Sequence, residues 1–545
     1  MNKKGLLILL LITLFGGFLR FYKLDKYPIQ LNHDEISQLY DSASIVETGK
    51  DIYGNFLPLA FPSTGDFKIG HYIYITVLPY LIFGMKEITI RIPAAFFGTL
   101  IIPAVFLFIN QFTKNWKLAL ISSVTLAITP SEIFYSRKSF ENVIGVFFIF
   151  LALFFLLRSL EKKEKKLDFL LTPLFLALPM YIYTSHTIAV PLIIMVFGTI
   201  FWRRILPQYK KYLLMTIIWG VLILPLIIIT INNPSIRFRA NSVSIFQDIN
   251  LAKQLQLIEI NNLIFLWVYK IKVVAEYSFT KYLNQFDPAL VFGKGMYLTN
   301  QDMIGLGPLL LLQLPFFFLG ILYILRFSFF DHWKFIFVLL FLSMVPSGLT
   351  FEAFSPHRSI LAFSLMSIIS SFGVFWFAQI LQKISVMSMK LVIICILGFL
   401  LTINFIYSVH IYTVNFPYEK SQQIHYPYKD VALFAWANLD RFDQIIIDPI
   451  YGESAPVRAV AVHYYLAFYG HYDPVKFQRD LKMEKSGIKF DKFSVREIDW
   501  RKDQNLKNTL IIASPWSLPT SIEASKVLKT FTFYDKSMAF YAIKL

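Results

Sequence analysis

The sequence predicts a polytopic α-helical membrane protein that ends in a small α/β domain. Of its 545 residues, 56% are hydrophobic and only 16% are charged, whereas soluble domains need far more charge on their surfaces. Apolar runs that approach or exceed the roughly 17–25 residues of a membrane-spanning helix recur through the first three quarters of the chain. From about Tyr412 onward the composition becomes mixed and charged, with no further span.

Eleven membrane spans are expected before that change of composition. The predicted spans are residues 5–22, 91–110, 116–134, 140–158, 167–183, 187–201, 212–231, 303–325, 334–351, 358–381 and 390–411. The apolar segment 71–84 is too short for a span and contains Pro79, so we expect an interfacial or re-entrant helix on the outer surface. With this threading the inner segments carry 17 Lys or Arg residues and the short outer loops carry three, as the positive-inside rule requires.

The same assignment of spans predicts the orientation of the protein in the plasma membrane. Lys3 and Lys4 precede the first apolar run, which lacks a small-residue cleavage site, so the N-terminus is expected in the cytoplasm. The stretches 23–90 and 232–302 become outer loops, and the second of these is rich in Arg, Lys and aromatic residues that suit a membrane surface.

A separate extracytoplasmic domain is expected at residues 412–545, after a membrane domain at residues 1–411. Alternating or continuous apolar runs predict strands, and one longer pattern predicts a helix over 456–468. The predicted strands are 444–448, 509–514, 530–534 and 538–545.

Charge and cysteine content exclude two other classes. The net charge of +17 is explained by loop Lys and Arg residues, and no basic stripe with a nucleic-acid-reading motif accompanies it, so no nucleic-acid partner is expected. The single cysteine, Cys395, lies inside an apolar run and can form no intrachain disulfide.

Two adjacent carboxylates, Asp34 and Glu35, stand in the first outer loop. One interpretation is helix capping, because Asn32 with Glu35 three residues later is an N-cap signature for a helix that ends at Gly49. The other interpretation is catalytic. A carboxylate in the first helical turn is kept ionised by the positive helix end, which suits a general base that takes a proton from an acceptor hydroxyl. The two interpretations are compatible.

Further charged residues lie at the predicted outer face. Arg137 and Glu141 are spaced i, i+4, so they could pair on one helical face and aim the guanidinium at a phosphate. Pro356 fits a helix start, where His357 and Arg358 favour an anion site. Anchoring at the membrane interface explains these residues equally well, and the same ambiguity applies to Arg91 at the start of the second span.

Together these stretches resemble the integral-membrane GT-C glycosyltransferases, in particular the bacterial protein O-mannosyltransferase and aminoarabinose-transferase group (glycosyltransferase family 39-like). The resemblance covers roughly residues 1–411 and is most specific in the first 145. The stretches that carry it, in order, are "NHDEISQLYDSASIVETGKDIYGNFLPLAF", "ITIRIPAAFFGTL", "ITPSEIFYSRKSFEN", "RFRANSVSIF" and "SPHRSILAF".

The resemblance implies the GT-C fold and transfer of a sugar from a polyprenyl-phosphate carrier to a protein, lipid or glycan acceptor, with inversion at the anomeric carbon. By the matching motif Asp34 is the general base, Glu35 its orienting neighbour and Arg91 a partner of Glu35. We assign Arg137, Arg358 and His357 to the leaving phosphate, because cations stabilise the charge that develops there.

Metal use varies among such enzymes, and no cofactor is required by the sequence. Asp34, Glu35, Glu141 and His33 could supply ligands to a divalent cation, but no spacing compels a metal. One departure from the family pattern is the stretch "YIYTSHTIAVPL", where His186 and Thr187 stand in place of an expected arginine. This departure bears on one substrate contact and on the identity of the donor.

Two alternatives to a glycosyltransferase come from other classes. A transporter or flippase of lipid-linked glycans would need charged or broken helices near the bilayer midplane, and the predicted spans have no charge near their middles. A non-catalytic scaffold would tolerate the loss of the Asp34 carboxylate.

The eleven-span threading can be tested at Val77. In a Cys395→Ser background, a Val77→Cys variant should react with a membrane-impermeant thiol reagent from outside intact cells, because segment 71–84 is placed on the outer surface. Labelling from the cytoplasmic side and not from outside would overturn this assignment of spans.

Overall fold

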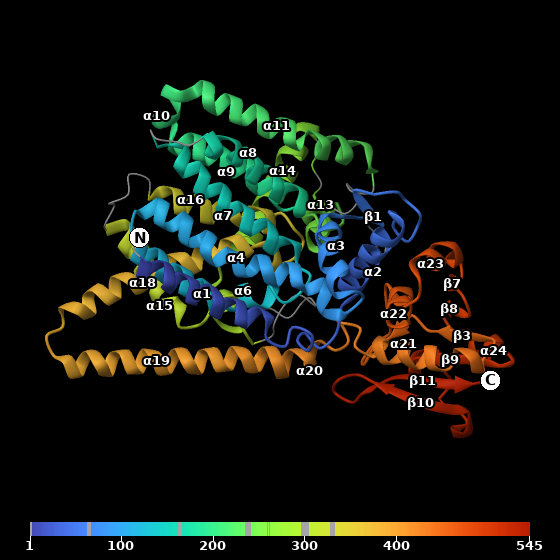
Figure 1. The fold of residues 1–545 in the computed structure, drawn as a ribbon. Helices are drawn as coiled ribbons and strands as arrows, with labels where there is room; N and C mark the ends of the chain where they lie inside the picture. The colour runs from blue at the N-terminus through green and yellow to red at the C-terminus, as the bar shows by residue number, and fades with distance from the viewer. Residues whose placement is uncertain are drawn as a thin grey trace. The chain divides into compact units, whose positions relative to one another are not determined.

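The apolar runs of the first three quarters of the chain form helices, and the main β-sheet lies in the last quarter (Figure 1). The structure is a computed structural model that describes residues 3–62, 67–161, 166–234, 241–258, 260, 262–295, 305–326, 333–520 and 522–545. Contacts divide the chain into unit 1, Met1–Tyr22 with Ala94–Ile411, and unit 2, Lys23–Pro93 with Tyr412–Leu545. Residues 23–90, predicted to be the first outer loop of a membrane domain over 1–411, therefore group with the C-terminal domain and not with the other membrane helices.

Unit 1 is built from apolar helices. Six helices in the described chain are long and apolar enough to cross a membrane: α1 (Lys3–Phe21), α4 (Glu87–Thr113), α7 (Glu141–Ser159), α10 to α11 (Trp202–Asn232), α18 (Ile360–Lys383) and the helix that begins with α19 and runs over Met387–Lys420. Shorter apolar helices are α3 (His71–Phe83), which belongs to unit 2, α5 (Trp116–Ala127), α8 (Lys166–Ile182), α9 (His186–Ile200), α15 (Gln313–Arg326) and α16 (Lys334–Ser343). A polytopic helical fold is confirmed, and each predicted span contains one of these helices.

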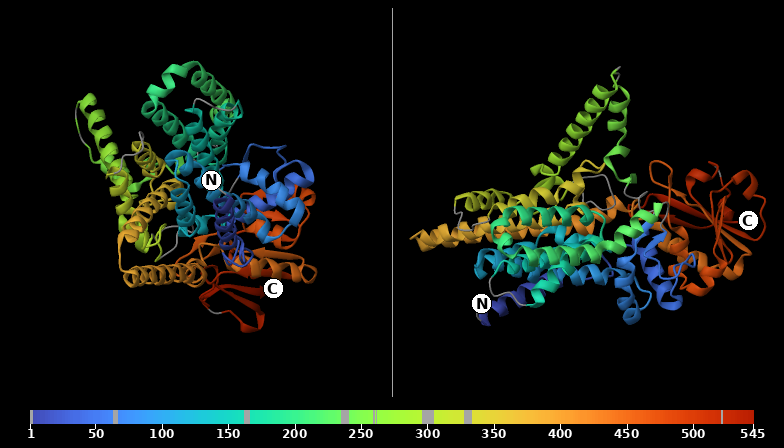
Figure 2. Two further views of the ribbon diagram at one scale, coloured as in Figure 1. Left: turned by 60° about the vertical axis from the view of Figure 1, so that its left-hand side comes forward. Right: turned by 90° about the horizontal axis from the view of Figure 1, so that it is seen from above.

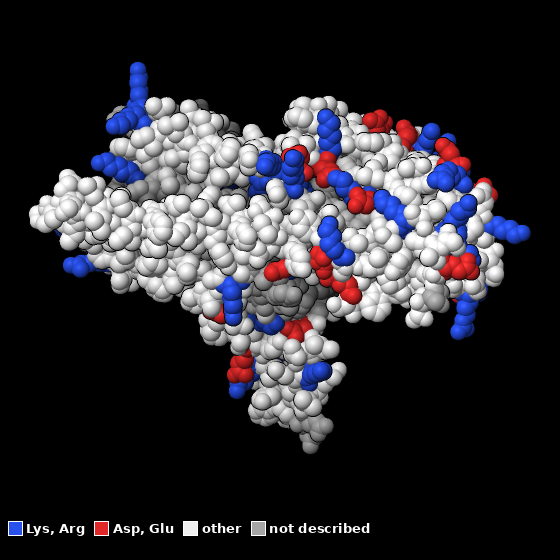
Figure 3. Space-filling view, turned by 90° about the horizontal axis from the view of Figure 1, so that it is seen from below, with Lys and Arg blue, Asp and Glu red and all other residues white. Residues whose placement is uncertain are grey.

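The outermost helices of unit 1 expose apolar side chains. Only 6% of the most apolar window of Met387–Lys420 is buried, and Phe399 is 65% exposed. On the face shown in Figure 3 this unit presents broad areas with neither acidic nor basic side chains. Such a surface suits lipid, because acyl chains neither hydrate nor pair with charges.

The helix α18 is the central helix of unit 1. Every residue from Ile360 to Gly373 is buried, and the serines on this helix make hydrogen bonds to neighbouring helices. Ser371 lies 2.6 Å from Ser122 of α5, and Ser367 lies 2.9 Å from Thr129. Small residues that pack closely and polar side chains that bond across helices are the usual means of helix association in membranes.

Three predicted spans begin or end elsewhere than expected. The span 116–134 is interrupted, because Pro130 starts a separate helix, α6 (Pro130–Tyr135). The span 334–351 breaks after α16 and finishes as the short α17 (Val345–Gly348). The prediction of a helix from residue 303 is wrong in its first part, since α15 starts at Gln313 and residues 305–312 are irregular.

The segment 232–302, predicted to be an outer loop, contains a long helix that was not predicted from the sequence. The helix α14 (Leu263–Asn284) has no buried residue, and Figure 2 shows it standing away from the other helices of unit 1 with α13 (Ile249–Gln256) beside it. Its C-terminal end is fixed by an ion pair between Lys281 and Asp248 at 2.8 Å. The first four residues of the stretch "RFRANSVSIF", 237–240, lie outside the described residues.

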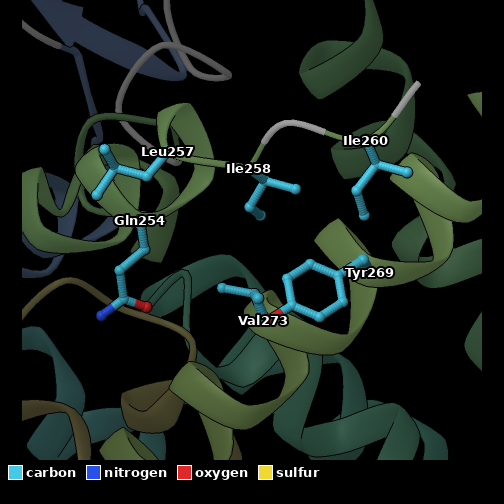
Figure 4. A pocket seen from close by; sticks show the side chains of 6 residues that line it. All are labelled: Gln254, Leu257, Ile258, Ile260, Tyr269 and Val273. Carbon is cyan, nitrogen blue, oxygen red and sulfur yellow. The ribbon is translucent and has the colours of Figure 1, made fainter.

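Between α13 and α14 is an open, mostly apolar pocket of about 490 Å³ (Figure 4). It is lined by Gln254, Leu257, Ile258, Ile260, Tyr269 and Val273. None of the candidate site residues lines it.

The C-terminal part of unit 2 contains a mixed seven-stranded sheet in the described residues, with the order β10-β11-β9-β3-β8-β7-β6. The central strand β3 is parallel to its neighbours β8 and β9, and the other pairs are antiparallel. The strands are β3 (Gln444–Ile447), β6 (Lys482–Glu484), β7 (Gly487–Phe490), β8 (Phe493–Val495), β9 (Thr509–Ala513), β10 (Val527–Thr532) and β11 (Met538–Lys544). An α/β C-terminal domain is therefore confirmed.

The predicted helix over 456–468 is observed only in its second half. The helix α22 covers Val462–Tyr469, because β5 (Val457–Arg458) pairs with β4 (Ile450–Tyr451) in a short antiparallel ribbon. Two further helices of this domain are α21 (Pro427–Ala437) and α23 (Pro474–Asp480).

Packing of α15 against α18 depends on two glycines, which gives a test of the fold. A Cβ at Gly373 would lie 2.0 Å from the carbonyl oxygen of Phe316, and one at Gly320 would lie 1.9 Å from that of Ile369. Gly373→Ala should therefore destabilise the protein by about 1–3 kcal/mol through overpacking, measured as a lower melting temperature in detergent. Gly398→Ala on α19 is the control, since a Cβ there has no described neighbour within 4 Å. Equal melting temperatures for the two variants would contradict the close helix contact.

Candidate active site

The acidic pair lies at the start of α2 (His33–Thr48), as predicted. The Asn32 side chain accepts hydrogen bonds from the backbone N–H groups of Asp34 and Glu35, both at 2.9 Å. Glu35 completes the capping box by accepting from the backbone N–H of Asn32 at 3.1 Å. Gly49 ends the helix in the left-handed conformation. The cap thus uses the side chains of Asn32 and Glu35, while Asp34 contributes only its backbone N–H to it.

Glu35 forms a buried ion pair with Arg91. The Nε of Arg91 donates to Oε1 of Glu35 at 3.1 Å, and the side chains are 0% and 2% exposed, respectively. The remaining guanidinium nitrogens of Arg91 donate to the carbonyl oxygens of Leu24, Pro28 and Gln30 at 2.8–3.0 Å. One arginine therefore joins the start of α4, the first turn of α2 and the loop between residues 24 and 30.

Asp34 has a different environment from its neighbour. Its side chain is 31% exposed, and its Oδ1 lies 3.4 Å from Nε2 of His33. A partly exposed carboxylate on a fixed helical turn can reach an acceptor hydroxyl, whereas a carboxylate that is buried and ion-paired cannot. Asp34 is therefore the better placed of the two to exchange a proton with a substrate.

One residue near Asp34 was missed by the sequence analysis. The ring of His425 lies 5.3 Å from the ring of His33, centroid to centroid, and is buried. The pKa of His425 is lowered to about 3, mainly by burial and to a smaller extent by the adjacent His33, while Asp34 opposes the shift. The imidazole is therefore neutral at physiological pH. This contact could not be predicted from the sequence, because no local pattern links residues almost 400 positions apart.

Arg137, in unit 1, makes hydrogen bonds to main-chain carbonyl groups. Its guanidinium donates to the carbonyl oxygens of Leu19 and Arg20 at 3.0 Å and of Tyr22 at 2.8 Å. These are the last carbonyls of α1, so Arg137 caps the C-terminal end of that helix. The predicted arrangement of Arg137 and Glu141 on one helical face is wrong, because residues 136–140 form the turn between α6 and α7 and only Glu141 is helical.

His357 and Arg358, also in unit 1, lie in a short 3₁₀ turn before α18 and share one acidic neighbour. Arg358 donates to Glu352 and, at 2.7 Å, to the hydroxyl of Ser355. Burial, together with the charges of Arg358 and Lys138, lowers the pKa of His357 well below its ordinary value. His357 is therefore neutral, and it can offer a phosphate a hydrogen bond but no charge.

The three short outer loops predicted for unit 1 come together in the structure. Asn142 donates to the carbonyl oxygen of His357 at 2.6 Å. Aromatic contacts continue from His357 to Phe140, from Phe140 to Tyr183 and from Tyr183 to His186, with centroid distances of 5.8–6.4 Å. His186, the residue that departs from the family pattern, is thus buried in the same cluster as the predicted phosphate-binding residues.

The predicted site residues therefore fall into two groups. Asp34, Glu35 and Arg91 lie together in unit 2, while the other four, Arg137, Glu141, His357 and Arg358, belong to unit 1. That the two groups form one site stays a prediction.

The described residues contain no group of three or more His, Cys, Asp or Glu side chains placed to hold a metal ion. Of the candidate ligands, Glu35 is bound by Arg91 and Asn32, and Glu141 belongs to the other unit. Within unit 2, His33 and Asp34 are the candidate ligands that remain, and these two side chains alone do not make a divalent cation site.

The ion pair can be tested with a substitution that keeps its shape. Glu35→Gln retains a side chain that can serve in a capping box but leaves the Arg91 guanidinium buried without a counter-charge. We expect a loss of about 3–5 kcal/mol in the free energy of unfolding, measured by thermal or denaturant unfolding in detergent. The control is Glu497→Gln, which breaks a pair with Arg458 in which both side chains are 60% exposed; it should cost less than about 1 kcal/mol. Similar losses for both variants would contradict this account.

Comparison with known proteins agrees with this fold. Residues 71–229 match the family described as dolichyl-phosphate-mannose-protein mannosyltransferase. The crystal structure of ArnT from Cupriavidus metallidurans bound to undecaprenyl phosphate superposes with a TM-score of 0.55 at 12% identity, covering 100% of this chain and 99% of ArnT. The apo state of that ArnT gives 0.51 at 12% identity, covering 99% of this chain and 98% of that one.

A third similar structure is the apo oligosaccharyltransferase of Archaeoglobus fulgidus, with a TM-score of 0.50 at 12% identity over 86% of this chain and 64% of that one. No curated protein sequence matches the chain significantly. The matched segment and the shared fold confirm the resemblance at the level that they cover: the chain has the GT-C fold, and its residues 71–229 are similar to the dolichyl-phosphate-mannose-protein mannosyltransferase family.

Proposed function

We propose that the protein transfers a sugar from a polyprenyl-phosphate carrier to a hydroxyl acceptor on the extracytoplasmic side of the membrane, with Asp34 as general base. The observation that carries the proposal is the contrast within the acidic pair: Glu35 is buried and paired with Arg91, and Asp34 is accessible on the same fixed turn. The name of the matched family contains dolichyl-phosphate-mannose, which is a polyprenyl-phosphate sugar, and the ArnT structure holds undecaprenyl phosphate. Both support a lipid-linked donor.

The reaction uses Asp34 at a single step. The acceptor oxygen attacks the anomeric carbon from the face opposite the phosphate, and its proton passes to the Asp34 carboxylate. The bond between the anomeric carbon and the phosphate oxygen breaks, and polyprenyl phosphate leaves with the bonding electrons. The configuration at the anomeric carbon is inverted, because attack and departure occur on opposite faces.

The leaving phosphate carries the charge that develops during this step. We assign its stabilisation to Arg358, with the neutral His357 donating a hydrogen bond. Arg137 supports the same group of loops, since it holds the end of α1 through three carbonyl oxygens. Glu141 is assigned to the orientation of these residues from the first turn of α7.

The assignment of Asp34 is tested by turnover. Purified protein, supplied with a panel of undecaprenyl-phosphate sugars and with membranes of cells that lack the protein as the acceptor source, should release undecaprenyl phosphate. Asp34→Asn should reduce kcat by about 10²–10⁴-fold, the contribution of a general base, with an unchanged melting temperature.

The matched control is Glu47→Gln, which removes an exposed carboxylate from the other end of the same helix and should leave turnover unchanged. Full activity of Asp34→Asn would overturn the base assignment. Absence of release from every donor by the unmodified protein would overturn the proposed reaction.

A further inference from the structure

We infer that the C-terminal domain, residues 412–545, is part of the catalytic machinery because His425 and Tyr465 position the Asp34 carboxylate. This inference rests on the proposed function and gives the domain a role in it. His425 and Tyr465 are positioning residues, since they act on Asp34 through the segment that precedes it.

The C-terminal domain holds the two residues that precede Asn32, the N-cap of α2. The hydroxyl of Tyr465 donates to the carbonyl oxygen of Leu31 at 2.9 Å, and Nε2 of Gln30 donates to the carbonyl oxygen of His425 at 2.7 Å. Both bonds are buried. They fix the main chain directly before Asn32, whose side chain in turn holds the N–H groups of Asp34 and Glu35.

His425 is itself held rigidly by the domain. Its φ of 59° lies in the left-handed region, which costs free energy for a residue other than glycine and persists only where the surroundings enforce it. The rings of Tyr428, Tyr451 and Tyr465 surround its imidazole at centroid distances of 5.5–6.0 Å. The position of the ring beside His33 is therefore fixed, and Nε2 of His33 lies 3.4 Å from Oδ1 of Asp34.

The C-terminal domain also bonds to the first turn of α4, the helix that carries Arg91. Nζ of Lys429 and the hydroxyl of Tyr469 both donate to Oε1 of Glu87, at 2.6 and 3.1 Å. Glu87 begins α4 and stands one helical turn before Arg91. The C-terminal domain thus contacts the chain on both sides of the Glu35–Arg91 pair.

The far end of α2 is bound to the same domain. Nε2 of Gln478 donates to the hydroxyls of Ser44 and Thr48 at 2.8 Å, and the hydroxyl of Tyr40 donates to the carbonyl oxygen of Tyr472 at 2.7 Å. The whole helix is thereby fixed along its length. The Asp34 carboxylate in the first turn of this helix is therefore also held in place. A general base needs such a fixed position, because its displacement by about 1 Å can lower the rate up to about 100-fold.

The test removes one hydroxyl. Tyr465→Phe in the full-length protein should lower kcat about tenfold, leave KM for the undecaprenyl-phosphate sugar unchanged, and increase amide hydrogen exchange at residues 32–36. In an Asp34→Asn background the same substitution should cause no further loss of turnover, because residues that act as a unit are not additive. Tyr541→Phe, on β11 of the same domain, is the matched control and should change neither quantity.

A second variant separates the ring of His425 from its main chain. His425→Asn keeps a residue that tolerates the left-handed region, so the bond from Gln30 is preserved while the contact with His33 is lost. We expect a lower kcat and a changed acid limb of the pH profile of kcat/KM, which a purely structural role would not move.

The outcomes separate this inference from the proposed function. Normal kcat and normal exchange in Tyr465→Phe, with Asp34→Asn inactive, would overturn the positioning role and leave the proposed function standing. Full activity of Asp34→Asn would overturn the base assignment and with it the catalytic purpose of the positioning. Faster exchange at residues 32–36 together with the tenfold loss of kcat supports the inference.

Discussion

The buried ion pair between Glu35 and Arg91 is the interaction on which the candidate site depends. Removing two charges from water costs several kcal/mol for each, and the cost is repaid only when further hydrogen bonds satisfy both groups. Here Arg91 donates to Glu35 and to three carbonyl oxygens, and Glu35 also accepts from the N–H of Asn32. These bonds end on different residues between 24 and 35. The hydrogen bonds that stabilise the buried ion pair therefore also determine the backbone conformation of residues 24–35.

The pair also explains how two adjacent carboxylates acquire different properties. The capping box was predictable because it depends on neighbours within four residues, and the structure contains it. The difference in exposure between Asp34 and Glu35 was not predictable from local sequence, since it arises from Arg91, more than fifty residues away. The contact with His425 is more distant still, and only the folding of the C-terminal domain against this loop creates it.

The same distinction applies to the fold. Apolar runs located the helices, because length and composition determine whether a segment can span a membrane. They misplaced the start of α15, where Gly307 packs so closely on the carbonyl of Val291 that a side chain would collide with it. They also missed α14, whose Lys and Glu residues interrupt the apolar pattern. Local composition thus reports which segments are apolar, while tertiary packing decides where each helix begins.

The rigidity of the candidate base has to come from tertiary packing. A helix of 16 residues such as α2 is only marginally stable alone in water, because nucleation is costly and propagation adds little per residue. All residues from Glu35 to Ile45 are nevertheless buried, and α22 and α23 of the C-terminal domain pack against this helix. Without that contact the cap and the ion pair would have to order both the helix and the loop before it. A domain that follows the last membrane helix in sequence therefore supplies the packing that residues 23–90 lack on their own.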